Sequence, residues 1–224
     1  MKTYYMDPRS GSCRRVSTVI GTLDIEVEEI FVDLLQGGNR TSEFLKVNPN
    51  AMVPVLKDGE TVLWEASAIM IYLCEQHGPT ELWPEGEPRY DVMKWMFWAG
   101  EHFRISAPIY FEENVIAPLM GKQPDSTRLA EAERRIDRFA PILEAELETR
   151  DFICGPAPTL ADLDLAAVVS QMPRSRVPYD KFPNMVKWVT RLEDKIPAWK
   201  HTGAELDRKM TESLNAARAQ TAAE

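Results

Sequence analysis

Residues 48–56 read Asn-Pro-Asn-Ala-Met-Val-Pro-Val-Leu, which places a proline inside what otherwise reads as a buried strand. Proline cannot donate a ladder hydrogen bond, so Val53-Pro54 is expected at a sheet edge or in a sharp turn. A cis bond there would turn the backbone of Val53 outward with its N–H and C=O unpaired. An extended peptide could then pair with Val53 as an added strand.

The segment that follows predicts a binding site for a carboxylate. Thr61 to Trp64 reads as a short strand, and Ala68 to Gln76 carries apolar residues at helical spacing. Glu65-Ala66-Ser67 is therefore a strand-to-helix turn, where unpaired backbone N–H groups and the helix dipole favour an anion. Glu65 could hold an ammonium group beside it. Alternatively, Glu65 is only a carboxylate placed favourably at a helix N-terminus.

Length, charge and cysteine content limit the classes of function. The chain has 224 residues, 44% of them hydrophobic and 27% charged, which is enough for two small cores. Its net charge of −9 argues against nucleic acid or an anionic membrane as a partner. The N-terminus is too polar for a signal peptide and no apolar run reaches the length of a membrane span, so a cytoplasmic protein is expected. Three cysteines, an odd number without Cys-x-x-Cys spacing, indicate neither a disulfide framework nor a metal site.

The order of predicted elements indicates two domains. Lys2 to Met6 and Glu26 to Asp33 read as strands that flank a helix from Cys13 to Leu23, as in a small thioredoxin-like sheet. Residues 80–88 break all periodicity and are expected to be a linker. Helical patterns then cover Tyr90 to Ala117, Thr127 to Thr149, Leu160 to Ser170 and Pro183 to Lys195. We therefore predict an α/β thioredoxin-like domain over 1–79, an all-α domain over 89–203, and a polar tail over 204–224 that is a frayed helix and then disordered.

At these residues the chain resembles the glutathione transferase family, in particular its cytosolic, serine-type, bacterial or plant-like members. The matched pattern is Asn48-Pro49, three residues, Val53-Pro54, and then an acidic residue, Glu65, that opens a helix with Ala-Ile and Tyr-Leu inside it. The resemblance covers about the first 200 residues. It implies glutathione as cosubstrate, a small electrophile as second substrate, a role in detoxification, and a homodimer. The family usually has serine directly after the acidic residue, whereas this chain has Ala66, with Ser67 one position later.

The turn before the first helix is the predicted catalytic segment. Arg9 to Val16 lies between the first strand and the first helix, so its hydroxyl groups face a helix N-terminus and can stabilise a thiolate. Serine-type members look like Ser-x-x-x-Arg-x-Val here, so the resemblance implies that Ser10 donates to the thiol. Ser12 and Cys13 stay open as alternatives, and either serine could simply cap the helix.

Two other mechanisms of the family are disfavoured by position. Cysteine-type members have their cysteine where Ser10 stands, whereas Cys13 falls about one turn into the helix. Tyrosine-type members have tyrosine near the end of the first strand, at the position of Met6. Tyr5 is one residue away, and strand alternation points it to the opposite face.

Further binding residues follow from the resemblance. Arg40 aligns loosely with the basic residue that meets the glycyl carboxylate of glutathione in plant-type members, and Lys46 is the alternative. Arg40 could also be a solvated surface arginine with no role in binding. The second substrate should be apolar, in a pocket between the Ser10 turn and the first long helix. That pocket is predicted to use Trp98, His102, Ile105 and Phe111; helix packing or a dimer interface is the other explanation for these aromatic and apolar residues.

The sequence thus predicts a glutathione transferase. Its catalytic residue is Ser10, and its predicted glutathione-binding residues are Ser12, Arg40, Val53, Pro54, Glu65, Ala66 and Ser67. The alternative is a non-catalytic binding or scaffolding protein with the same fold, which the Ala66 departure favours. A thiol-disulfide oxidoreductase ranks third because paired cysteines are missing. Thr159 and Asp162 resemble a capping box, to which we assign a role in folding.

Overall fold

The structure, a computed structural model, describes residues 1–221 and contains two compact units. The first unit comprises Met1–Trp83 and Ile196–Met210, and the second comprises Pro84–Lys195 and the chain from Thr211 onward. The division between Trp83 and Pro84 falls within the segment 80–88 that the sequence marks as a linker. The hydrophobic periodicity of the sequence does not predict that Ile196–Met210 belongs to the first unit.

The first unit is built on a mixed four-stranded sheet of order β2-β1-β3-β4. β1 (Lys2–Met6) runs parallel to β2 (Val27–Phe31) because α1 (Gly11–Thr22) provides the crossover between them. β3 (Val55–Asp58) pairs antiparallel with β1 and with β4 (Thr61–Trp64). The remaining elements of the unit are η1 (Gly38–Arg40), α2 (Ser42–Val47) and α3 (Ala66–His77). The predicted thioredoxin-like sheet is confirmed.

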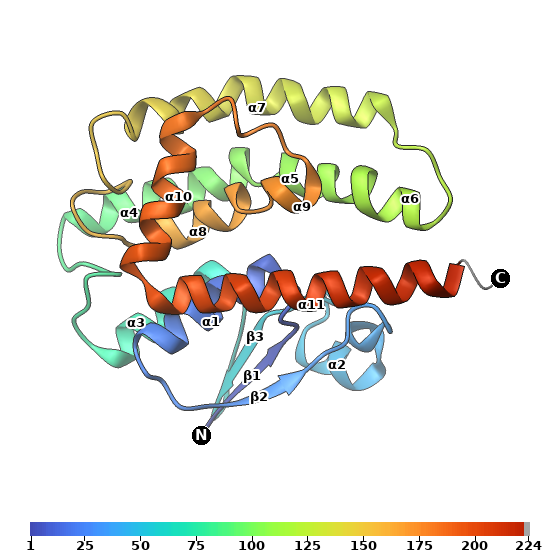
Figure 1. Cartoon of the computed structure of the whole chain (residues 1–224). Helices are drawn as coiled ribbons and strands as arrows, with labels where there is room; N and C mark the ends of the chain where they lie inside the picture. The colour runs from blue at the N-terminus through green and yellow to red at the C-terminus, as the bar shows by residue number, and fades with distance from the viewer. Residues whose placement is uncertain (222–224) are drawn as a thin grey trace. The chain divides into compact units, whose positions relative to one another are not determined.

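α1 and α3 pack against each other beside the sheet (Figure 1). Val16 and Val19 of α1 and Ile69 and Leu73 of α3 are fully buried between the elements, and Tyr4 of β1 faces them. Such apolar side chains supply the main free energy of folding, about 25 cal/mol for each Å² removed from water. The core therefore fixes the positions of the turns at the end of the sheet.

α11 (Pro197–Thr221) starts in the first unit and stays helical through residues that were predicted to be a frayed helix and then disordered. The helix predicted at the start of this tail is present, and it continues through Thr221; residues 222–224 lie outside the described part of the chain. The guanidinium of Arg14 stacks 3.5 Å from the Trp199 ring centroid and donates to the Trp199 carbonyl at 3.0 Å. A Cβ at Gly203 would lie 2.4 Å from a nitrogen of Arg14, so a larger residue there would force the stacked guanidinium to shift. These contacts and the buried Leu206 hold the start of α11 to the rest of the first unit, and the residues after Gly203 are rich in the helix formers Ala, Glu, Leu, Lys and Arg.

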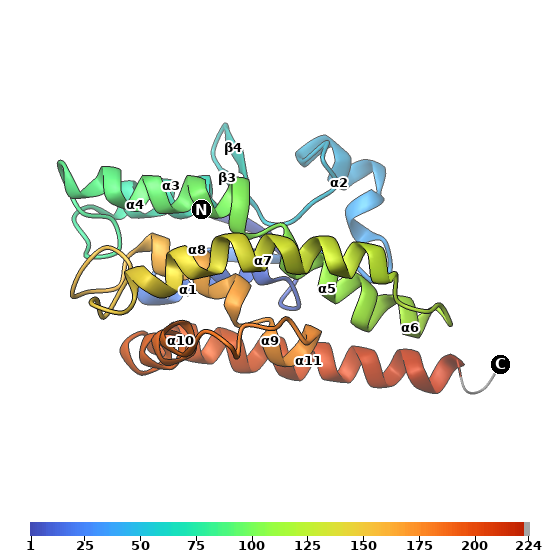
Figure 2. The ribbon, with the colours of Figure 1, turned by 90° about the horizontal axis from the view of Figure 1, so that it is seen from above.

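The second unit is helical, which confirms the predicted all-α domain. Its elements in the range 84–195 are α4 (Pro88–Trp98), η2 (Ala99–Phe103), α5 (Ser106–Phe111), η3 (Glu112–Ile116), α6 (Ala117–Leu119), α7 (Ser126–Glu146), α8 (Leu160–Val169), α9 (Met172–Ser175) and α10 (Pro183–Lys195). α7 runs alongside η2 and α5 (Figure 2). At the start of α8, Thr159 and Asp162 form the predicted capping box. Asp162 is fully buried and also accepts from the Trp188 indole N–H at 2.9 Å, which fits a role in folding.

The predicted helical pattern from Tyr90 to Ala117 is present, and two π-helical segments, η2 and η3, interrupt its regular α-helical bonding. The backbone N–H of Arg104 bonds to the carbonyl of Ala99 five residues earlier, at 2.9 Å. Pro108 has no N–H to donate to the carbonyl of Arg104, so regular α-helical bonding is broken there.

Candidate functional site

Strand register brings three predicted site segments to one end of the sheet. The end of β1 lies opposite the start of β3, which in turn lies opposite the end of β4. The Ser10 turn follows β1, Val53 precedes β3, and Glu65 follows β4. All three segments belong to the first unit and leave the sheet at the same end.

Ser10 is the N-cap of α1. Its Oγ accepts from the backbone N–H of Cys13 at 3.3 Å, and its own N–H donates to the carbonyl of Asp7 at 2.9 Å. Because the oxygen accepts from the backbone, the hydroxyl hydrogen remains available to an anion in front of the helix. The first N–H groups of α1 and the helix dipole act in the same direction.

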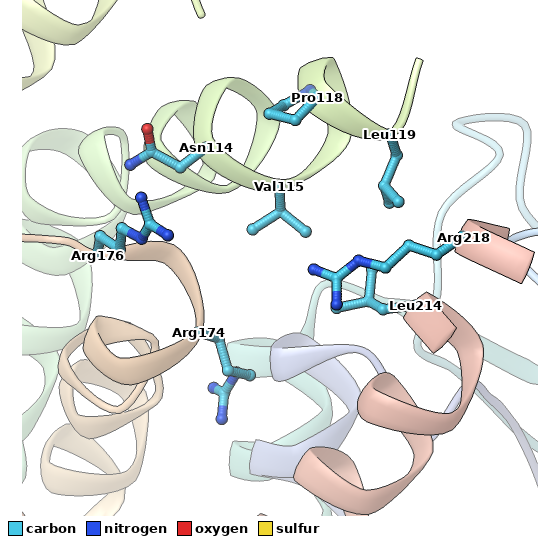
Figure 3. Close-up of a pocket in the computed structure, with 8 residues that line it drawn as sticks. All are labelled: Asn114, Val115, Pro118, Leu119, Arg174, Arg176, Leu214 and Arg218. Carbon is cyan, nitrogen blue, oxygen red and sulfur yellow. The ribbon is translucent and has the colours of Figure 1, made fainter. Parts of the chain in front are cut away.

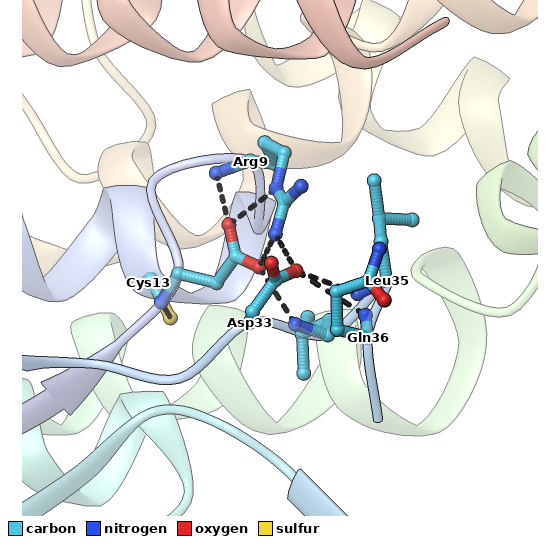
Figure 4. Close-up of polar contacts among 7 residues, drawn as sticks. Arg9, Cys13, Asp33, Leu35 and Gln36 are labelled. Carbon is cyan, nitrogen blue, oxygen red and sulfur yellow. Dashed lines mark hydrogen bonds and ion pairs between the residues drawn. The ribbon is translucent and has the colours of Figure 1, made fainter. Parts of the chain in front are cut away.

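An ion-pair network that the sequence did not reveal holds this turn (Figure 4). Asp7 is fully buried and accepts from Arg9 through the backbone N–H at 2.9 Å, Nε at 2.8 Å and Nη2 at 2.6 Å. Arg9 Nη2 also donates to Asp33 at 2.6 Å, and the N–H of Leu34 donates to Asp7 at 3.1 Å. The Arg9 guanidinium lowers the pKa of Asp33. The only sequence signal was an acidic residue directly after a strand with an arginine two positions later.

The alternatives to Ser10 are engaged in the structure. Ser12 Oγ accepts from the Arg15 guanidinium at 3.0 Å. Cys13 is fully buried, its sulfur accepts from the Asp7 N–H at 3.5 Å, and burial raises its pKa to about 11, so its thiolate is disfavoured.

Neither tyrosine of β1 is placed as a thiol donor. Tyr4 is buried and donates to the Cys13 carbonyl at 2.9 Å. Tyr5 points away from it and packs edge-on against Phe44, with ring centroids 6.2 Å apart.

The loop before β3 presents an unpaired stretch of backbone. The buried side chain of Asn48 shapes the loop, since its Oδ1 accepts from the Asn50 N–H at 3.0 Å and its Nδ2 donates to the Met52 carbonyl at 2.7 Å. The Val53–Pro54 bond is cis. Among residues 1–221, no partner is found for the backbone N–H or C=O of Val53. A bound peptide could therefore satisfy both groups.

A hydrogen bond from the residue next to Arg40 joins its segment to this loop. The side chain of Asn39 donates to the Ala51 carbonyl at 2.7 Å, which ties η1 to the Val53 loop. Arg40 is exposed and has no ion-pair partner in the described chain, so its guanidinium is available to a ligand. Lys46, the alternative, is exposed in the last turn of α2.

Glu65 adopts a rare backbone conformation at the start of α3, with φ 75° and ψ 113°. A positive φ at a residue other than glycine costs about 1–3 kcal/mol and clusters at functional sites. The Glu65 side chain is exposed, does not cap its own helix, and forms no ion pair within residues 1–221. Ala66 and Ser67 begin α3, so their N–H groups lie where an α-carboxylate would bind.

The predicted second-substrate residues lie in the second unit. Trp98 packs against Phe139 of α7, with ring centroids 6.3 Å apart, and His102 stacks on the same ring at 4.9 Å. His102 and Ile105 line a hollow of about 400 Å³ between η2 and α7. The other lining residues are Glu101, Glu131, Arg134, Arg135, Arg138 and Phe139. Trp98 and Phe111 do not line this hollow, so only two of the four predicted residues do, and the role of the four as a pocket stays a prediction.

Within residues 1–221, no helix is both long and apolar enough to span a membrane. The same residues contain no group of three or more His, Cys, Asp or Glu side chains arranged to hold a metal ion.

Two family models match the chain, one within each unit. The model for "Glutathione S-transferase, N-terminal domain" matches residues 2–75, and the model for "Glutathione S-transferase, C-terminal domain" matches residues 107–195. The chain is similar to human glutathione transferase theta-2, solved with glutathione and an unknown ligand, at 26% identity and a TM-score of 0.86, over 99% of this chain and 92% of that chain. It is similar to a delta-class glutathione transferase of Nilaparvata lugens at 25% identity and a TM-score of 0.81, over 97% and 100% of the two chains. Glutathione transferase F2 of Populus trichocarpa shares the fold at 22% identity and a TM-score of 0.83, over 93% and 100%.

Proposed function

The chain belongs to the glutathione transferase family, and from that premise we propose that it conjugates the glutathione thiolate to small apolar electrophiles. The observation that carries the proposal is the gathering of the Ser10 turn, the unpaired Val53 backbone and the strained Glu65 at one end of the sheet. We further propose that the protein is a cytoplasmic homodimer with a role in detoxification.

Each part of glutathione has a proposed partner. The N–H and C=O of Val53 pair with the cysteinyl backbone, next to Pro54. The start of α3, formed by Glu65, Ala66 and Ser67, holds the α-carboxylate and ammonium of the γ-glutamyl end. Arg40 meets the glycyl carboxylate, and Ser12 lies beside the thiol.

Ser10 donates its hydroxyl hydrogen to the glutathione sulfur. Lowering the pKa of a thiol from about 8.5 to about 6.5 requires about 2.7 kcal/mol of preferential stabilisation of the thiolate. One charge-assisted hydrogen bond contributes roughly 1.5–3 kcal/mol, and the helix N-terminus adds about 0.3–1 kcal/mol. Together the groups at the N-terminus of α1 contribute about 1.8–4 kcal/mol, a range that includes the energy required.

The reaction needs only an activated and positioned nucleophile. The thiol proton leaves to solvent, and a sulfur lone pair forms a C–S bond to the electrophilic carbon. A halide then leaves with its bonding electrons; with a conjugated acceptor, the displaced electrons take a proton from water instead. No residue of the chain becomes covalently modified.

A non-catalytic binding or scaffolding protein is the second candidate, and Ala66 is the observation that favours it. The family's usual serine hydroxyl is missing at that position, so the γ-glutamyl carboxylate depends on backbone N–H groups and Ser67.

Calorimetric titration with glutathione separates the two candidates. Run in buffers of different ionisation enthalpy at about pH 7.5, it should show release of about 0.8 proton per site, because the free thiol is mostly protonated and the bound thiol mostly ionised. S-methylglutathione, which has no thiol proton, is the control and should bind without release. Absence of binding heat would favour the scaffold, and binding without proton release would reject thiolate activation.

A further inference from the structure

Arg9 is an enclosed charge directly before Ser10 in the chain. Its environment differs from that of Arg176 and Arg218 in the second unit, which are exposed in the lining of a pocket of about 400 Å³ (Figure 3). The side chain of Arg9 is only 11% exposed and lies between two carboxylates. Because little water surrounds it, its charge is screened less than that of an exposed arginine.

The cluster of Asp7, Arg9 and Asp33 carries two negative charges and one positive charge (Figure 4). Nη2 of Arg9 donates to a carboxylate oxygen of each aspartate at 2.6 Å. With all three groups ionised, the net charge of the cluster is −1. It would be −2 without the guanidinium of Arg9 and zero without the carboxylate of Asp33.

Backbone hydrogen bonds hold the two carboxylates beside the Ser10 turn. The Ser10 N–H donates to the Asp7 carbonyl at 2.9 Å, so the backbone of this aspartate is part of the turn. The carboxylate of Asp33 accepts from the N–H groups of Leu35 at 3.0 Å and Gln36 at 3.3 Å, which fixes its position. The cluster therefore places a defined set of charges next to the N-terminus of α1.

These charges affect any anion in front of α1. A carboxylate near a thiolate disfavours ionisation of the thiol, and a nearby guanidinium favours it. The other charged residues in the segment 7–22 are Arg14 and Arg15, which are buried and donate to the Trp199 carbonyl and to Ser12 Oγ, each at 3.0 Å. Glu65 is exposed at the same end of the sheet. None of these three charged groups is altered in the variants described below.

We propose that Arg9 is a positioning residue of the thiolate site: it compensates the carboxylates of Asp7 and Asp33, so that an anionic sulfur in front of Ser10 meets a net charge of −1 rather than −2. Arg9 acts through the two carboxylates and does not itself contact the sulfur. As a role in catalysis, this effect rests on the proposed function. As a property of the Ser10 position, it can be measured without glutathione.

The variant S10C introduces a thiol at the position of the Ser10 hydroxyl group. The pKa of that thiol follows from the pH dependence of its alkylation by iodoacetamide, measured by mass spectrometry of the labelled peptide. The native thiols do not interfere, because burial raises the pKa of Cys13 to about 11 and those of Cys74 and Cys154 to about 12.

Changes of charge in the S10C background should shift the pKa of the introduced thiol in opposite directions. R9Q should raise it by about 0.5 or more, and D33N should lower it by about 0.5. R9Q/D33N has the wild-type net charge of −1 although it lacks the ion pair, so its thiol pKa should lie within about 0.3 of that in S10C alone. If Arg9 only held the shape of the turn, both single changes would shift the pKa in the same direction and the double change would not restore it. Either of those results would overturn the proposal.

Two control variants change the charge at the other end of β1. Lys57 and Glu28 are both exposed, and both pair with Thr3 in the register of the sheet. K57Q and E28Q therefore repeat the charge changes of R9Q and D33N away from the Ser10 turn, and each should shift the thiol pKa by less than about 0.2. If the R9Q variants do not fold, D33N decides alone: a lowered thiol pKa supports the proposal, and an unchanged or raised pKa overturns it.

The same substitutions in the protein that retains Ser10, titrated with glutathione, test the proposed function separately. The pKa of the bound thiol should shift with the same signs as in the S10C series. If the S10C series shifts as expected but the wild-type protein does not bind glutathione, the role of Arg9 is supported and the proposed function fails. If glutathione ionises in the wild-type complex but the S10C series does not shift, the role of Arg9 is overturned and the proposed function stands.

Discussion

Replacing Ser10 by alanine separates the two roles that the structure gives to its hydroxyl group. The hydroxyl caps α1 through the Cys13 N–H at 3.3 Å, and in the proposed complex it donates to the glutathione sulfur. Loss of one charge-assisted hydrogen bond, about 1.5–3 kcal/mol, should raise the pKa of the bound thiol by about 1–2. Loss of the cap should lower the free energy of unfolding by about 1 kcal/mol, or the melting temperature by about 2–4 °C.

The assay is the pH dependence of kcat/KM for conjugation of chlorodinitrobenzene, together with direct ultraviolet titration of the bound thiolate. If the wild-type thiol titrates near about 6.5, S10A should be about 5- to 50-fold slower at that pH and within about twofold of wild type at about pH 9. A pH-independent loss would show that positioning, rather than ionisation, was affected.

Two matched variants distinguish the helix-capping role of Ser10 from its role as a hydrogen-bond donor to the thiolate. S10T keeps both functions and should stay close to wild type in melting temperature and in thiol pKa. S10D keeps an excellent N-cap but replaces the hydroxyl donor by a carboxylate, so it should melt like wild type while the bound thiol keeps an ordinary or raised pKa. The reasoning is refuted if S10A binds glutathione with the thiol pKa of the wild-type complex.

Three further predictions concern the frame of the site. G203A should lower the free energy of unfolding in urea by about 1–3 kcal/mol, although alanine is the better helix former, because its Cβ would meet the buried guanidinium of Arg14 at 2.4 Å. G100A has no atom within 4 Å of its Cβ and should not destabilise the protein. Equal effects of the two variants would contradict this packing. Burial raises the pKa of Cys13 to about 11, so iodoacetamide at about pH 7.5 should not modify this thiol until the protein is denatured. Mass spectrometry reads the labelling, and rapid labelling of Cys13 in the native protein would contradict its burial. Arg9 lowers the pKa of Asp33 from its ordinary 3.8, so this ion pair stabilises the fold above about pH 4 and its contribution is lost as the pH falls through the lowered pKa. The difference in melting temperature between wild type and D33N should therefore shrink on acidification. A difference that stays constant with pH would contradict a stabilising role of the ion pair.

The parts of the site that the sequence could predict are those determined by local chemistry. Val53-Pro54, Glu65 and Ser10 each stand at a junction between a strand and the next element, where proline, a helix start or an N-cap serine has a local reason to be. Once the strand order is assigned, these junctions meet at one end of the sheet without any knowledge of side-chain contacts. This explains why the turn residues were placed correctly in the fold.

Contacts between distant parts of the chain could not be predicted in this way. Arg9 and Asp33 are 24 positions apart, and nothing in either local sequence indicates the other. Arg176 and Arg218 read as ordinary surface arginines until α9 and α11 bring them to one pocket. The start of α11 contacts the first helix through Arg14, Trp199 and Gly203, and nothing in either local sequence indicates that contact.

The contact between Gly203 and Arg14 also has a consequence for biosynthesis. A ribosome releases the thioredoxin-like segment long before it has polymerised Trp199, so the nascent first unit waits with Arg14 unstacked while the intervening helices emerge. Released fragments that end at Trp83 should accordingly be digested by protease far faster than the same segment within the full chain, and this unit completes its folding only once Trp199 is available to Arg14.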